Sequence, residues 1–418
     1  MNVLIKSASI VAPSNSSLHF KQRDIHVKNG KIVTIAPKIP IEDGMRIIQR
    51  DNLHVSLGWF DSGVAFGEPG YEERETLNNG LEVASKSGFT EVLLNTNTNP
   101  SPDSSSAIVF LKERSAKKST ILHPLGNVTV KGKGEALAEM YDMHQAGAVA
   151  FYDFKAPISD ANLMKIALQY AQNFDGLVFS YPLDINVKGK GVANEGIVST
   201  RLGLKGIPAL AEELQIARDL YILEYTGGKL HIPTISSESS VKLVAEAKKK
   251  GLDVSCSVAI HNLSLTDTAL EEFDSRYKLM PPLRTQKDVK VLQKAVLNGT
   301  IDFVTTDHTP MDIEEKRVEF DNAGYGTTGL ESAFGALNTI FGVEKTIELL
   351  TKGRSRFGLE TPKWEEGETA NLSLFNPSGN YTFGNENILS TSKNSAFVGQ
   401  ELTGKVYGVI NNGKLNLA

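Results

Sequence analysis

Short apolar runs alternate with stretches of helical spacing along the centre of the chain. Two helical stretches have a clear stop, because residues 209–225 precede Gly227 and residues 241–250 precede Gly251, and glycine is common just past a helix end. Repeated strand–helix units predict a parallel α/β fold, and a (β/α)8 barrel over residues 55–360 matches the length. The runs that predict strands are residues 91–95, 121–124, 148–151, 176–180, 229–232, 253–258 and 301–305.

Both ends of the chain have a pattern typical of short strands and tight turns. Near the start, two β-prone runs lie on either side of Asn29-Gly30, a dipeptide that favours a two-residue hairpin turn. Near the other end, residues 404–410 and the Asn412-Gly413 turn are similar. We therefore expect residues 1–54 and 361–418 to form one small β-sandwich domain beside the barrel.

Composition narrows the class of protein without naming a function. The 418 residues are 40% hydrophobic and 22% charged, with a formal net charge of −5 and no long run of one sign, which argues against a nucleic-acid or membrane surface. No apolar run approaches the ~20 residues that span a bilayer, and the first nine residues are too short and polar for a signal peptide. Because Cys256 is the single cysteine, no internal disulfide can form and we expect a cytoplasmic protein.

Five short motifs follow one another along the chain: Leu57-Gly58-Trp59-Phe60-Asp61 with Gly67-Glu68-Pro69-Gly70, Asn97-Thr98-Asn99-Pro100, Pro281-Pro282-Leu283-Arg284, Asp307-His308-Thr309-Pro310, and Gly329-Leu330-Glu331. In order and in spacing they resemble the dihydroorotase family of the amidohydrolase superfamily, whose sister activities are allantoinase and dihydropyrimidinase. The resemblance implies hydrolysis of a cyclic amide by a metal centre at the carboxyl ends of the barrel strands.

The expected metal ligands are mostly missing. A bound metal lowers the pKa of water and polarises the carbonyl, and imidazole and carboxylate groups hold it. The resemblance implies four histidines, a bridging carbamylated lysine or aspartate, and a final aspartate that is also the general base. The histidine positions hold Gly63, Ala65, Ser180 and Thr234, while Asp153 stands at the bridging position and Asp307 at the final one. We therefore expect no bound metal, with zinc as the cofactor only if other side chains replace these ligands.

Four further residues near these positions have simpler interpretations. Lys155 is a second candidate for the bridging position, but a loop lysine is more often a solvated charge. His231 falls at a family position that points away from the metal, and His261 and His308 are interpreted as structural.

The implied substrate contacts are reduced as well. Gly67 stands where the family has the arginine that binds the substrate carboxylate, and Asn97 persists as a candidate substrate contact. Arg284 is a weaker candidate, because it is more often expected to pair with a neighbouring carboxylate. We expect the vacated space to be filled by Tyr152, Tyr181, Met280 and Met311.

These residues favour a non-catalytic dihydroorotase homologue that acts as a structural partner in pyrimidine biosynthesis. The resemblance implies a homodimer and a complex with aspartate transcarbamoylase or with an active dihydroorotase. Two alternatives stay open. One is an active dihydroorotase or related cyclic amidase that uses unusual ligands, or Asp307 alone as the base. The other is a binding protein that keeps the pocket without the chemistry.

Overall fold

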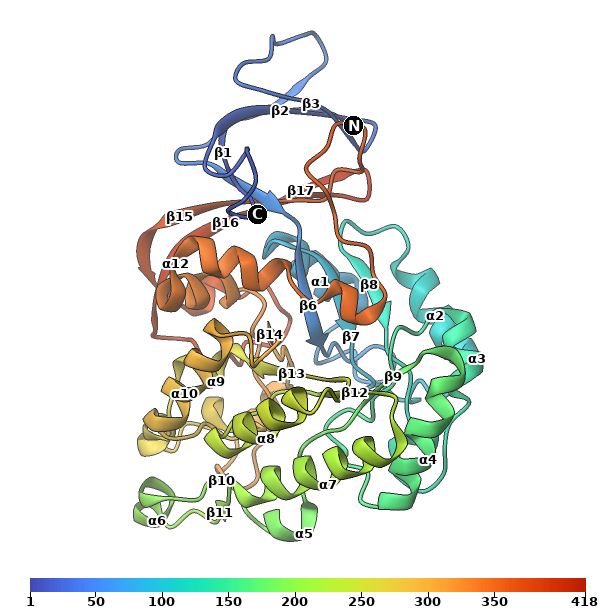
Figure 1. Ribbon diagram of the computed structural model, residues 1–418. Helices are drawn as coiled ribbons and strands as arrows, with labels where there is room; N and C mark the ends of the chain where they lie inside the picture. Colours follow the sequence, from blue (N-terminus) through green and yellow to red (C-terminus); the bar gives the residue numbers. More distant parts are fainter.

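The computed structural model describes residues 1–418 as a barrel and a β-sheet domain (Figure 1). In Figure 1 the sheet lies in the upper part and the barrel below it. Helix α12 (Ala333–Thr351) packs against strands of both parts. The architecture confirms the predicted barrel and the predicted β domain built from both chain ends.

Seven parallel strands and one isolated bridge form the barrel wall. Phe151 takes the place of a fourth strand, because it bridges Gly126 on one side and Val178 on the other. The predicted run at residues 148–151 therefore contributes a bridge and no strand. The strands are β6 (Trp59–Val64), β7 (Phe89–Leu94), β8 (Ile121–Pro124), β9 (Leu177–Phe179), β12 (Lys229–Ile232), β13 (Val254–Ala259) and β14 (Phe303–Thr305).

Helices cover the outside of this wall. The longer ones are α1 (Leu77–Lys86), α2 (Ser105–Ser115), α3 (Met140–Ala146), α4 (Ala161–Ala171), α7 (Leu210–Thr226), α8 (Glu238–Lys249), α10 (Gln286–Leu297) and α12. Short elements lie in the loops: α5 (Ile185–Lys188), β10 (Ala193–Asn194), α6 (Ile197–Leu202), β11 (Gly206–Ile207), α9 (Ile260–Ser264) and α11 (Ile313–Lys316). The two helices predicted from their spacing and glycine stops are α7 and α8. None of the helices combines the length and apolar character needed to cross a membrane.

The barrel closes between its first and last strands. Val64 forms a β-bridge with His308. A buried carboxylate, that of Asp61, makes a second contact between the same two strands. Asp61 on β6 accepts hydrogen bonds from the Thr305 hydroxyl at 2.6 Å and from the Thr306 amide at 3.2 Å. Burial raises the pKa of Asp61 to about 6, although these hydrogen bonds oppose that shift. The contact fixes the end of β6 against the end of β14.

The terminal domain is one eight-stranded sheet with the order β17-β16-β15-β5-β1-β2-β3, and β4 pairs with β1. Asn29 and Gly30 join β2 to β3 with φ values of 52° and 78°, the left-handed conformation that a two-residue hairpin turn requires. The strands are β1 (Asn2–Val11), β2 (Gln22–Lys28), β3 (Lys31–Ala36), β4 (Arg46–Ile48), β5 (His54–Leu57), β15 (Leu372–Thr382), β16 (Glu401–Asn411) and β17 (Lys414–Leu417).

A buried ion pair joins the sheet domain to the barrel. Arg354 is 1% exposed and donates to Glu91 at 2.9 Å and to the Gly58 carbonyl at 2.7 Å. Asn371, next to β15, donates to the same Glu91 oxygen at 3.1 Å. Glu91 therefore connects β7, the segment after α12 and the start of the C-terminal strands.

Replacing Glu91 by alanine should destabilise the fold. The change leaves the buried Arg354 guanidinium without its carboxylate, and breaking a buried pair in this way costs about 3–5 kcal/mol. We expect the free energy of unfolding, measured by urea denaturation, to fall by that amount. The control is Glu238→Ala, which removes a surface carboxylate paired with Lys242 and Lys287 and should change little. An unchanged urea midpoint for Glu91→Ala would contradict the role of this pair.

Acid should weaken the same contact. Burial alone would raise the pKa of Glu91, but His123 and Arg354 outweigh it and lower the pKa from 4.5 to about 2. The stability that this carboxylate adds is therefore complete above pH 4.5 and is lost as the pH falls toward 2. Over this range, the free energy of unfolding should fall more steeply for the wild-type chain than for Glu91→Ala.

Candidate functional site

The residues singled out in the sequence lie where the barrel strands end, the side on which barrel active sites form. Gly63 lies on β6, while Ser180, Thr234 and Asp307 follow β9, β12 and β14. We call this region the barrel mouth. Gly63, Thr234 and Asp307 line a hollow of about 20 Å³ there, which holds about one water molecule.

Tyr152 is the one of the four residues expected to fill the vacated space that lines this hollow. Tyr152 and Tyr181 are each 3% exposed and belong to one apolar cluster with Phe179 and Met280. The rings of Tyr152 and Phe179 are 5.2 Å apart. Met311 packs elsewhere, against the glycines of the following loop. Filling of the mouth by Tyr181 and Met280 therefore stays a prediction.

Asp307 and Lys155 form an ion pair at the barrel mouth. The Lys155 ammonium lies 2.8 Å from a carboxylate oxygen of Asp307, and the two side chains are 14% and 7% exposed. Burial raises the pKa of Asp307 above its ordinary value, although the charge and hydrogen bond of Lys155 oppose that shift. The interpretation of Lys155 as a solvated loop charge was wrong, because the loop after Phe151 turns this side chain into the mouth.

The backbone is strained at three residues of the barrel mouth. Lys155, Thr234 and Asp307 have φ values of 52°, 50° and 46°. None is a glycine, and such conformations cost of order 1–3 kcal/mol each. They persist only where the surrounding structure enforces them. Residue type and spacing gave no signal of this strain.

Asp153 is held away from any shared site by its own hydrogen bonds. It accepts from the Asn127 side chain at 3.0 Å and from the amides of Val128 and Thr129 at 2.9 and 3.2 Å. The Thr129 hydroxyl donates to its second oxygen. Burial raises the pKa of Asp153, and these hydrogen bonds oppose the shift. Both oxygens are therefore engaged by the loop after β8.

The four positions where histidines were expected supply no metal ligands. The Ser180 hydroxyl donates to Asp219, and the Thr234 hydroxyl is buried without a partner. Gly63 and Ala65 have no ligand atoms in their side chains. Nowhere in the 418 residues do three His, Cys, Asp or Glu side chains converge as metal ligands do. One carboxylate paired with an ammonium does not fit a zinc centre, which needs three or four nitrogen, sulfur or oxygen donors.

The two candidate substrate contacts differ in their surroundings. Asn97 has a buried side-chain oxygen without a hydrogen-bond partner, so it is free to accept one. Arg284 is 3% exposed and donates to Ser236 at 3.0 Å, to Asn194 at 2.9 Å and to Glu212 at 3.4 Å. Every nitrogen of its guanidinium is engaged within the protein. A substrate role for either residue stays a prediction.

The three histidines that follow or lie on the barrel strands near the mouth are buried, and burial favours their neutral form. His231 lies between Ser255 and Ser257 and stacks on Phe303 at 5.0 Å. Both ring nitrogens of His261 lack partners, and burial lowers its pKa to about 3. Burial also lowers the pKa of His308 to about 4. Neutral imidazoles avoid the cost of burying charge.

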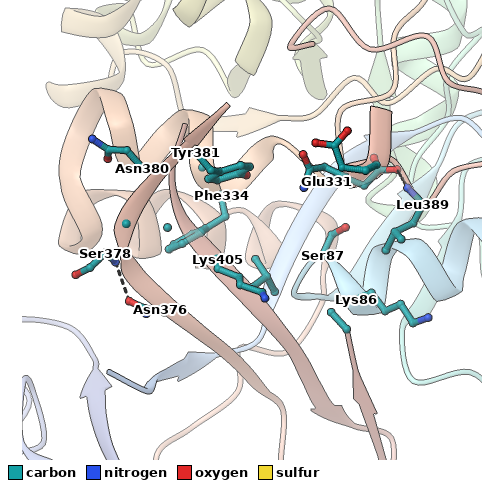
Figure 2. Close-up of a pocket in the computed structure, with 17 residues that line it drawn as sticks. Lys86, Ser87, Glu331, Phe334, Asn376, Ser378, Asn380, Tyr381, Leu389 and Lys405 are labelled. Atoms are coloured by element: carbon teal, nitrogen blue, oxygen red, sulfur yellow. Dashed lines mark hydrogen bonds between the residues drawn. The ribbon is translucent and has the colours of Figure 1, made fainter. Parts of the chain in front are cut away.

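A much larger hollow lies outside the barrel mouth (Figure 2). It measures about 540 Å³ and lies between the β15–β16 hairpin, the start of α12 and the end of α1. Lys86, Lys405 and Glu331 are among the residues that line it (Figure 2). The Glu331 carboxylate accepts from the Leu389 and Ser390 amides at 3.1 and 2.9 Å. No side-chain polar atom that lines this hollow is both buried and unpaired.

Comparison with known proteins gives matches along the whole chain. Residues 54–240 match the family model described as Dihydro-orotase-like. A dihydroorotase of Pelotomaculum thermopropionicum is 36% identical over 99% of this chain and 98% of that protein. A dihydroorotase of Carboxydothermus hydrogenoformans is 38% identical over 97% of this chain and 95% of that protein.

Solved structures agree on the fold. An L-hydantoinase (dihydropyrimidinase) of Arthrobacter aurescens has a TM-score of 0.83 and 20% identity, covering 100% of this chain and 98% of that one. A D-hydantoinase of a Thermus species has a TM-score of 0.78 and 19% identity, covering 99% and 94%. At this identity the likeness establishes the architecture alone.

Breaking the ion pair at the barrel mouth should destabilise the protein. Lys155→Met leaves the Asp307 carboxylate buried and unpaired, at a cost of about 3–5 kcal/mol. Asp307→Asn combined with Lys155→Met removes both charges, so we expect the double variant to lose less than the sum of the two single variants. Urea denaturation of all four proteins measures this coupling. Strictly additive losses would contradict a direct pairing.

Proposed function

Because the chain belongs to the dihydroorotase family, we propose that it keeps the family's barrel as a non-catalytic homologue and acts as a structural partner in pyrimidine biosynthesis. One observation carries the proposal. Asp307, at the position of the expected general base, is paired with Lys155 in a hollow of about 20 Å³. A base held by an ammonium accepts a proton from water poorly, and a ring substrate has no room beside it.

The chemistry of amide hydrolysis supports the same conclusion. An amide is a poor electrophile, and water needs activation before it can attack. Sites that bind small molecules typically measure about 300–1,000 Å³. At the barrel mouth, aromatic side chains such as Tyr152 occupy that space, and the neutral Thr234 and Ser180 cannot replace imidazole ligands.

Two buried ion pairs support a structural role. The guanidinium groups of Arg284 and Arg354 are bound by carboxylate and by carbonyl or amide oxygens. Such networks keep the barrel rigid without any chemistry at its mouth. The partners we propose are a second copy of the chain, aspartate transcarbamoylase and an active dihydroorotase.

The second candidate is an active dihydroorotase or related cyclic amidase. The observation that favours it is the set of relatives named dihydroorotase, at 33–38% identity over nearly the whole chain. In this case Lys155 would have to withdraw from Asp307, and side chains from outside the mouth would have to hold zinc.

Zinc content and turnover separate the two candidates. We expect the purified chain to contain less than one zinc per molecule and to hydrolyse dihydroorotate no faster than buffer. A purified dihydroorotase relative serves as the positive control. Stoichiometric metal together with turnover that Asp307→Asn abolishes would establish the second candidate instead.

The partner proposal needs its own measurement. Affinity purification of the tagged full chain from its source cell should recover aspartate transcarbamoylase or an active dihydroorotase. A tagged chain of unrelated fold, expressed at the same level, is the control for nonspecific capture. Recovery of neither enzyme would defeat the structural role, whatever the result of the activity assay.

A further inference from the structure

Four lysine and arginine side chains of this chain are buried, and they differ in what balances their charge. Arg284 and Arg354 each have a carboxylate partner. Lys278 lies over an aromatic ring, with its ammonium 4.9 Å from the ring centre of Tyr325. Lys316, which is 3% exposed, has neither kind of partner. Because burying an ammonium without a counter-charge is costly, Lys316 is the one buried cation whose charge the protein leaves unbalanced.

Backbone oxygens hold the Lys316 ammonium in a fixed position. It donates to the carbonyl oxygens of Ser275 at 2.9 Å and of Lys278 at 3.2 Å. The Ser275 hydroxyl donates in return to the Lys316 carbonyl. An ammonium has three hydrogens to donate, so one of them has no acceptor in the protein. Since the side chain is already ordered, an anion that accepts this hydrogen bond would not have to order it.

Lys316 lines a hollow of about 550 Å³, which we call the Lys316 hollow. It lies among residues 274–276, the segment 311–317 that contains α11, and residues 385–398. This volume is within the range of about 300–1,000 Å³ that is typical of small-molecule sites. None of the residues that line it also lines the hollow at the barrel mouth. The Lys316 hollow is therefore a separate space with room for a small organic molecule.

The charges that line the Lys316 hollow favour an anion. Arg317 is exposed, and its guanidinium has no hydrogen-bond or ion-pair partner in the protein. The carboxylates are mostly engaged: Asp274 lies 2.6 Å from Arg276, and Asp312 accepts from an amide of α11 at 2.8 Å. Glu73 is exposed to solvent. The lining cations are Arg276, Lys316, Arg317 and Lys393, and the lining carboxylates are Glu73, Asp274 and Asp312.

We propose that the Lys316 hollow binds a small phosphorylated molecule, whose phosphate group supplies the counter-charge that Lys316 lacks. A phosphate group presents three acceptor oxygens that point in different directions, whereas a carboxylate presents two in one plane. The cations of the hollow come from separate segments of the chain, which favours the tetrahedral group. The site is distinct from the barrel mouth, so the proposal stands or falls separately from the proposed function.

The titration of Lys316 is consistent with such a site. Burial, followed by the charge of Lys278, lowers the pKa of Lys316 to about 7, and the charge of Lys155 adds to this shift. Asp274 and Glu315 oppose it. A bound anion favours the ammonium and so raises this pKa. Because no histidine or cysteine lines the hollow, proton uptake on binding near pH 7 would come from Lys316.

Calorimetric titration of the full chain with inorganic phosphate tests the site, at low salt so that screening is small. We expect saturable binding at one site per chain. Arg317→Ala should weaken it by roughly tenfold or more, because a charge-assisted hydrogen bond is lost, and should leave the melting temperature almost unchanged. Arg46→Ala is the matched control, since Arg46 is also exposed and lies on β4 of the terminal sheet. No saturable binding, equal weakening by both variants, or tighter binding of succinate than of phosphate would overturn the proposal.

The pH dependence of sulfate binding tests the role of Lys316. Sulfate has the shape of phosphate and keeps its charge around neutral pH, so the protein alone titrates. Its affinity should be highest below pH 7 and fall by up to about tenfold per pH unit above it, because the amine must first be protonated. Arg317→Ala should bind more weakly with the same pH dependence.

Lys316→Met should bind sulfate weakly and without this pH dependence, and its melting temperature shows whether it is folded. If it does not fold, the profiles of the wild-type chain and of Arg317→Ala decide the question. A flat profile for the wild-type chain, or wild-type affinity in Lys316→Met, would exclude Lys316 as the cation of the site.

Discussion

The buried carboxylate of Asp61 is the contact on which the geometry of the barrel mouth depends. It joins β6, the first barrel strand, to Thr305 and Thr306 at the end of the last strand. A parallel barrel has to close between these two strands, which are more than 200 residues apart in the chain. The hydrogen bonds offset the cost of burying this carboxylate, which still shows in its raised pKa of about 6. Closure brings Gly63 beside Asp307, and so creates the mouth in which the remaining polar groups meet.

Within that mouth, the pairing with Lys155 offsets the cost of burying the Asp307 carboxylate. A carboxylate in an apolar barrel end is costly unless a cation or several donors neutralise it. The loop after Phe151 places the Lys155 ammonium beside this carboxylate. The backbone of Lys155 is in the left-handed conformation there, with a φ of 52°. The pairing engages one of the two carboxylate oxygens of Asp307. Charge balance at the mouth therefore comes from a residue 152 positions away in the chain.

The polar groups of the barrel differ in how completely they are satisfied. Arg284 and Arg354 lie in networks where every donor has an acceptor, and these networks hold the loops and the terminal sheet against the wall. Thr234 at the mouth, and Asn97 and His261 in the segments after β7 and β13, instead have buried unpaired side-chain atoms.

The sequence by itself determined the architecture and the residue types at the expected ligand positions. Strand–helix alternation and the motif order predicted the barrel, the hairpin pattern predicted the β domain, and residue identity alone excluded imidazole at Gly63, Ala65, Ser180 and Thr234. The strands and helices were predictable because periodicity reflects local conformational preference. The lack of imidazole at these positions was predictable because a side chain without a ligand atom lacks it in any fold. Only the tertiary structure decided which charges meet. Lys155 and Asp307 are 152 residues apart, and Arg284 and Glu212 are 72 apart. No local pattern encodes such partners, because they are set by where packing places the loops.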